Sequence, residues 1–193
     1  MLGGDERLYV GSDDGLWIFC GDAGGLLLAG RALEGAAVLA LTLVGGTFLL
    51  VGLGDGTARE SFDGGQSWLA TGAPAPEPIG LRAATSAGPL ALANPRLRGA
   101  TAYARLGGNP PALLGAGAGG MQIFRSEDAG IHWEPAHMEI MLGGPITALI
   151  PATSLGAAWA GAADGSILRG VDGGRLWQVA GRAGAAVRCL ATG

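Results

Sequence analysis

The chain contains the octapeptide Ser61-Phe62-Asp63-Gly64-Gly65-Gln66-Ser67-Trp68, and a close copy follows at Ser126-Glu127-Asp128-Ala129-Gly130-Ile131-His132-Trp133. A third copy, Gly170-Val171-Asp172-Gly173-Gly174-Arg175-Leu176-Trp177, lacks the initial serine. A fourth copy, Cys20-Gly21-Asp22-Ala23-Gly24-Gly25-Leu26-Leu27, keeps the aspartate and the glycine but lacks the tryptophan. Each copy ends a longer window that superposes on the others without a gap, at 11–27, 52–68, 117–133 and 161–177. Repetition at intervals of about forty residues or more indicates a repeat array such as a β-propeller.

One repeat divides into short strands joined by tight turns. The best example begins with an apolar strand at 146–150 and continues with a second strand at 157–161. Asp164-Gly165 then makes a hairpin turn, because this dipeptide tolerates the positive φ that such turns need. The third strand is 166–169, the Asp motif turns the chain again, and the fourth strand opens at Leu176. The same division fits residues 37–70 and 100–138.

The two ends of the chain complement each other. The N-terminal repeat begins at its second strand, Leu8–Gly11, and the chain ends just after a first strand, Val187–Ala191. We expect the N- and C-terminal strands to pair, which closes the ring, removes exposed sheet edges and makes the chain a complete propeller. Residues 1–193 are therefore predicted to form a single all-β propeller domain of four to five blades.

Residues 74–99 form an irregular segment that complicates the blade count. A Pro-rich loop at 73–78 is followed by 79–94, which resembles the first two strands of a repeat but has no Asp motif. The sequence therefore contains five predicted inner hairpins but only four complete four-stranded blades. The segment is either a truncated blade of a five-bladed ring or a hairpin inserted into a four-bladed one.

The motif Ser/Thr-x-Asp-x-Gly-x-x-Trp resembles the Asp-box, or BNR repeat, of sialidase-like propellers and of repeat proteins similar to photosystem II assembly factors. The resemblance implies a hairpin turn between the third and fourth strands, at the outer rim of the ring. There the aspartate accepts hydrogen bonds from its own turn, the glycine supplies positive φ and the tryptophan buries apolar surface. The residues with this structural role would be Ser61, Asp63, Gly65, Trp68, Ser126, Asp128, Gly130, Trp133, Asp172, Gly174 and Trp177, with Asp22 and Gly24 in the weakest copy.

The catalytic residues of sialidases do not carry over to this chain. Those enzymes use three arginines, a tyrosine activated by a glutamate and a further acid, whereas no glutamate is evidently placed to activate Tyr9 or Tyr103. We therefore interpret the chain as a non-catalytic scaffold that binds a protein or another ligand at the channel-mouth face. A glycan-acting hydrolase or lyase and a self-assembling structural protein are the alternatives.

Three aspartates align at the turns between second and third strands. The resemblance implies that Asp14, Asp55 and Asp164 lie on the channel-mouth face, where they are weak candidates for a cation site. The alternative is ordinary Asp-Gly turn chemistry. His132 and His137 lie five residues apart with Pro135 between them, which places them on opposite faces of a strand. We expect no cofactor.

Composition limits the partners. A net charge of −4 and the lack of a basic patch argue against nucleic acid. The uncharged stretch Gly35–Gly54 contains Gly45-Gly46, so two strands and a turn are predicted in place of a membrane helix. No signal peptide is visible, which predicts a cytoplasmic protein. The outer strand Leu26–Leu33 carries one arginine and no acid, and we expect it either to form a homo-oligomer contact or to be covered within the fold.

Overall fold

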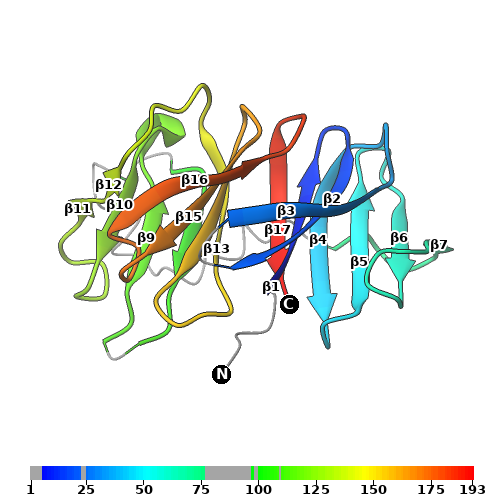
Figure 1. Cartoon of the computed structure of the whole chain (residues 1–193), viewed down its shortest axis with the longest axis horizontal. Coiled ribbons are helices and arrows are strands. Elements are labelled where there is room, and N and C mark those ends of the chain that lie inside the picture. The colour runs from blue at the N-terminus through cyan, green and yellow to red at the C-terminus, as the bar shows by residue number, and fades with distance from the viewer. Residues whose placement is uncertain (1–5, 23–24, 77–96, 98–99, 109) are drawn as a thin grey trace.

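The computed structural model describes residues 6–22, 25–76, 97, 100–108 and 110–193. The regular elements with described bounds are strands, apart from the short 3₁₀ turn η2 (Ala118–Gly120). The predicted all-β propeller fold is confirmed, with the strands grouped into separate curled sheets (Figure 1). No described helix is long and apolar enough to cross a membrane.

The described strands form four sheets, each of which runs from an inner to an outer strand. The first blade has the order β17-β1-β2-β3, with β17 at Val187–Thr192, β1 at Glu6–Ser12, β2 at Gly15–Asp22 and β3 at Gly25–Ala32. The second has the order β4-β5-β6-β7, with bounds Val38–Val44, Phe48–Leu53, Ala58–Ser61 and Leu69–Thr71. The prediction that Gly35–Gly54 forms two strands joined by a turn is thus confirmed by β4 and β5.

The other two blades follow the same plan. The third has the order β8-β9-β10-β11, with bounds Tyr103–Arg105, Leu113–Ala116, Ile123–Ser126 and Glu134–Pro135. The fourth has the order β13-β14-β15-β16, with bounds Ile146–Pro151, Ala158–Ala162, Ser166–Val171 and Leu176–Arg182. A short strand, β12 (His137–Met138), pairs in parallel with the outer side of β16 and makes this sheet five-stranded.

The predicted pairing of the terminal strands is confirmed. β17 and β1 run antiparallel, with register from Leu8 opposite Thr192 to Gly11 opposite Cys189. Reciprocal backbone hydrogen bonds between Arg7 and Gly193 extend the ladder, at 2.9 and 3.0 Å. The last strand of the chain is therefore the inner strand of the first blade.

The inner strands place the blades in the order second, first, fourth, third. β17 packs against β4 on one side and β13 on the other, and β13 also packs against β8. The connection from β7 to β8 contains the predicted irregular segment 74–99. Most of it, including the hairpin predicted at 79–94, lies outside the described residues. The choice between four and five blades and the single-domain assignment stay predictions.

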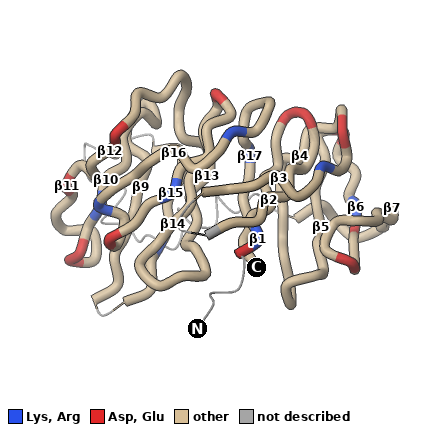
Figure 2. The backbone as a smooth tube through the Cα atoms, viewed as in Figure 1, with Lys and Arg blue, Asp and Glu red and all other residues tan. Residues whose placement is uncertain are grey.

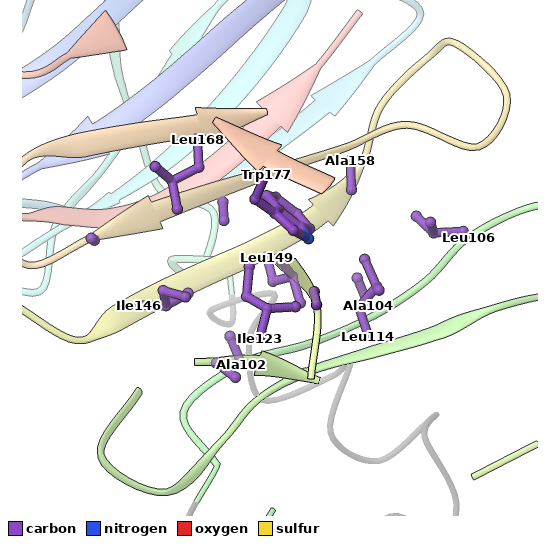
Figure 3. Packing of buried hydrophobic residues seen from close by; sticks show 14 of the residues in the cluster. Ala102, Ala104, Leu106, Leu114, Ile123, Ile146, Leu149, Ala158, Leu168 and Trp177 are labelled. Atoms are coloured by element: carbon purple, nitrogen blue, oxygen red, sulfur yellow. The ribbon is translucent and has the colours of Figure 1, made fainter. Parts of the chain in front are cut away.

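The largest apolar cluster lies between the third and fourth blades. Trp177 on β16 is fully buried and packs with Leu114, Ile123 and Leu149 from three other strands (Figure 3). A second cluster joins the fourth blade to the first, where the buried Glu6 carboxylate accepts hydrogen bonds from Thr153 N (2.7 Å) and Trp159 Nε1 (3.2 Å). Neighbouring blades are thus held by side chains of both apolar and polar kinds.

Gly11 lies where the second blade packs against β1 and β17 of the first blade. A Cβ built at Gly11 would collide with Cys189 Sγ and would lie 2.8 Å from Val38 Cγ1. Gly11→Ala should therefore lower the free energy of unfolding by about 1–3 kcal/mol through overpacking. Gly30→Ala is the control, because a Cβ there meets nothing within 4 Å. Equal stability of the two variants in urea unfolding would contradict this packing.

Candidate functional site

In the Asp-motif turn of the second blade, the aspartate accepts hydrogen bonds from residues of the same turn. Asp63 Oδ1 accepts from the Ser61 hydroxyl (2.8 Å) and from the backbone N–H groups of Gln66 (2.9 Å) and Ser67 (3.0 Å). Asp63 Oδ2 accepts from the Ser67 hydroxyl at 2.5 Å. The Ser61 hydroxyl in turn accepts from Gly65 N at 2.9 Å. The carboxylate is therefore occupied within its own turn.

The third blade repeats this geometry. Asp128 Oδ1 accepts from the Ser126 hydroxyl (2.8 Å) and His132 N (2.9 Å), and Oδ2 contacts His132 Nδ1 at 2.5 Å. The sequence spacing placed His132 and His137 on opposite faces of a strand and did not predict that His132 pairs with the motif aspartate. His132 occupies the motif position that Ser67 occupies in the second blade, where Ser67 also bonds the motif aspartate. The alignment of the two copies could therefore have indicated this contact.

Each complete motif also fixes its tryptophan. The indole N–H groups of Trp68, Trp133 and Trp177 donate to the carbonyl oxygens of Gly65 (3.1 Å), Gly130 (2.9 Å) and Gly174 (2.9 Å). These glycines have φ values of 93°, 93° and 80°, in the left-handed region where a Cβ is strained. The glycine thus turns the chain and presents the acceptor to a side chain three residues later.

The fourth-blade copy departs from this pattern. Gly170 replaces the serine, and a Cβ there would lie 2.6 Å from Trp177 Cζ2, so the ring excludes a larger residue. The Asp172 side chain makes no hydrogen bond within the described part of the chain, and its backbone has a φ of 53°. In the weakest copy, Gly24 and the side chain of Asp22 lie outside the described residues. The structural role assigned to the motif residues stays a prediction.

The three inner-turn aspartates do not share a site. Asp14 pairs with Arg31 (2.9 Å) and accepts from Gly35 N (3.2 Å), whereas Asp55 accepts from Thr57 N (2.9 Å) and Oγ1 (2.7 Å). Asp164 accepts from Ser166 N (2.9 Å) and from Gly143 N (2.8 Å) in the loop that enters the fourth blade. Within the described ranges no group of three or more His, Cys, Asp or Glu side chains could hold a metal ion. Asp14 and Asp164 therefore fasten their turns to neighbouring loops.

The described carboxyl groups with clearly shifted pKa values are all shifted in the same direction. Hydrogen bonds from the Ser67 hydroxyl and backbone hold the pKa of Asp63 well below its usual range, and those from His132 lower the pKa of Asp128 to about 2. Every carboxyl group with a clearly shifted pKa has it lowered: Asp13, Asp55, Asp63, Glu127, Asp128 and Asp164. These groups are carboxylates at neutral pH and are poor proton donors.

Neither tyrosine is placed as a nucleophile. Tyr103 is buried, burial raises its pKa, and its hydroxyl lies 3.4 Å from the Leu97 carbonyl oxygen. Tyr9 is buried between the first and second blades, and its hydroxyl makes no hydrogen bond of normal geometry within the described residues. Cys20 and Cys189 are both free thiols, and burial raises the pKa of Cys189 to about 12.

Two surface features were not foreseen from the sequence. A groove of about 570 Å³ lies between the first and second blades, beside Arg7, Cys20 and Trp68. Two exposed methionines, Met121 and Met141, lie near the inner turns of the third and fourth blades. The sequence gives no signal for either, because each depends on how neighbouring blades are placed.

Comparison with protein-family models finds no match, and comparison with curated proteins finds none. Among solved structures, YCF48 bound to a D1 peptide is similar over 75% of this chain and 39% of that chain, with 19% identity and a TM-score of 0.29. YCF48 from Cyanidioschyzon merolae is similar over 98% and 61%, with 16% identity and a TM-score of 0.34. A GH74 enzyme from Niastella koreensis is similar over 92% and 24%, with 11% identity and a TM-score of 0.34. The chain thus spans less than two thirds of each of these proteins, and similarity of this degree assigns no function.

The motif aspartates allow a matched mutational test. Replacing a carboxylate by an amide removes its charge and one acceptor oxygen, so Asp63→Asn and Asp128→Asn should lower the melting temperature at neutral pH. Asp172→Asn should leave it unchanged, because that side chain has no hydrogen bond to lose and asparagine tolerates positive φ. A loss of stability for Asp172→Asn equal to the other two would contradict this account.

The same variants predict a pH dependence. Asp128 has a pKa of about 2 in the folded protein, below the value of about 3.9 expected for an unfolded chain. The stability that its ionisation contributes is therefore present above about pH 4 and is lost as the pH falls toward the folded value. The difference in melting temperature between wild type and Asp128→Asn should shrink over this range.

Proposed function

We propose that the protein is a non-catalytic propeller scaffold that binds a partner protein at its channel-mouth face. This face consists of the turns between second and third strands and the loops that enter each inner strand, and these lie along the upper side of Figure 1. The observation that carries the proposal is an exposed methionine pair on this face.

Met121 and Met141 belong to neighbouring blades. Met121 directly follows η2, and a Cβ built at Gly120 would lie 2.6 Å from Pro145 Cβ, at the end of the loop that contains Met141. The same loop is bound to the Asp164 turn through Gly143 N. Met121 is 48% exposed and Met141 is 99% exposed. Methionine is flexible and polarisable, and it recurs at protein-binding surfaces that accommodate varied partners.

The charged groups of this face support partner binding rather than catalysis. Arg188 forms a two-pronged ion pair with Asp13 (2.7 Å for each bond), and Arg31 pairs with Asp14. Figure 2 shows acidic positions along the upper loops, with arginines near several of them. Paired charges of this kind form a polar rim around an apolar contact. A glycan hydrolase would instead need an acid whose pKa is raised so that it can protonate the leaving group, whereas Asp63 and Asp128 in the described motifs have a lowered pKa.

The proposal is tested with variants on opposite faces. In crosslinking of the tagged protein within its host cells, Met121→Glu together with Met141→Glu should abolish the partner adduct. Leu155→Glu is the control, because Leu155 is 83% exposed but lies in the turn between β13 and β14, at the opposite end of the sheet. Adducts lost only with Leu155→Glu, or unchanged by all substitutions, would refute a partner site on the mouth face. Wild-type hydrolysis of a panel of aryl glycosides would refute the non-catalytic assignment.

A second candidate, self-assembly, is favoured by the outer strand of the first blade. β3 has eight residues, whereas β7 has three and β11 has two. The outer side of β16 is partly covered by β12. Leu27 is 77% exposed and Leu28 is 52% exposed on β3, which ends its sheet with an unpaired edge. A long apolar edge of this kind is a template for pairing with another chain.

Self-assembly through β3 predicts a measurable oligomer. Wild-type protein should run as a dimer in size-exclusion chromatography with light scattering at high micromolar concentration, and Leu28→Glu should be a monomer. Leu155→Glu again serves as the control, since it removes an exposed leucine far from β3. A monomeric wild type at that concentration would eliminate this candidate.

A further inference from the structure

The groove between the first and second blades exists because their outer strands differ in length. β3 extends over eight residues and β7 over only three, so the outer part of the first sheet has no counterpart in the second blade. The groove of about 570 Å³ is walled by Ile18, Cys20 and the β3 backbone, and is floored by Gly64, Gly65 and Trp68. This volume lies within the range of small-molecule sites.

Arg7 supplies the charge of this groove. Its side chain is exposed and forms no ion pair within the described part of the chain. The Tyr9 hydroxyl and the Cys20 thiol lie beside the guanidinium and raise its pKa. Arg31, which also borders the groove, stacks on Trp17 at 4.0 Å and pairs with Asp14, so its charge is already matched. Among the described residues, Arg7 is therefore a groove cation without an acidic partner, and no Asp or Glu side chain is among the described lining residues.

Two glycines keep this space open. A Cβ at Gly64 would lie 3.1 Å from Arg7 Nη1 and 3.4 Å from the Tyr9 hydroxyl oxygen, so the guanidinium rests over the Asp-motif turn of the second blade. Gly30 pairs with Ile18 on the groove wall, and a Cβ there meets nothing within 4 Å. The result is a fixed cation beside an apolar wall formed by Ile18 and the half-buried Trp68 ring.

We propose that this groove binds a small organic carboxylate that has an apolar body. The carboxylate pairs with the guanidinium of Arg7, whose planar N–H donors match a carboxylate in two-pronged geometry. The apolar body lies against Trp68 and Ile18. The site lies between the first and second blades, is lined by neither Met121 nor Met141, and does not depend on the partner proposed for the channel-mouth face.

Phenylacetate and its neutral analogue phenylacetamide test the proposal by ligand-observed NMR on the full chain. Wild type should bind phenylacetate with a dissociation constant on the order of 1 mM, as expected for one charged anchor and a small ring. Phenylacetamide should bind about fivefold more weakly, because it lacks the charge. Equal binding of the two compounds, or no saturable binding of phenylacetate up to about 10 mM, would overturn the proposal without any variant.

Variants then locate the site. Arg7→Gln should reduce phenylacetate binding to the level of the amide, and Gly30→Leu should remove binding of both compounds by filling the groove. Arg59→Gln changes the net charge equally and should have no effect, because Arg59 donates hydrogen bonds to Thr57 and Ala58 and is not among the described lining residues of the groove. Unchanged binding in Gly30→Leu, which retains Arg7, would place the ligand elsewhere and refute the site even if Arg7→Gln failed to fold.

Discussion

The antiparallel ladder between β17 and β1 is the interaction on which the rest of the structure depends. It joins Arg7 to Gly193 and makes the end of the chain the inner strand of the first blade. The same strand packs against β4 of the second blade and β13 of the fourth. Because β17 belongs to the first sheet and packs against two others, its position determines how the first blade is oriented toward both neighbours. The close approach at Gly11 is a direct result, since Cys189 and Val38 meet there.

The Asp motif couples each turn to the blade beside it. Its carboxylate closes the turn, its glycine offers a carbonyl oxygen, and its tryptophan uses that acceptor while filling an apolar cluster. The first blade has Leu27 where the other copies have tryptophan, and this leucine is exposed. The copy that lost the ring is thus the copy whose outer strand carries exposed leucines and borders an open groove.

Much of the fold could be predicted because it depends on local and periodic information. The spacing of the motif gave the turns, and the alternation of apolar runs and Asp-Gly pairs gave the strands. The missing first strand at Leu8 and the extra one at Val187 predicted the terminal ladder. These features follow from backbone chemistry that repeats with the sequence.

The candidate sites could not be predicted in the same way. Arg7 is unremarkable in the sequence, and its role follows from the lengths of β3 and β7 and from the lack of a side chain at Gly64. The two exposed methionines come from separate blades, which approach each other at Gly120 and Pro145. The inner-turn aspartates aligned in the sequence, yet the structure keeps them apart because each belongs to its own sheet. A site between two repeats depends on residues and strand lengths in which the repeats differ. The motif that the repeats share does not reveal these differences.

The small parallel strand β12 has a consequence for symmetry. It occupies the outer side of β16, while β7 and β11 offer only three and two residues. Among the described outer strands, β3 is the longest and pairs on one side only. Two copies can pair their β3 edges about a two-fold axis, and neither copy then has a β3 edge left to offer. An assembly built through β3 is therefore closed at two subunits, whereas continued growth into a fibre requires a second, complementary surface.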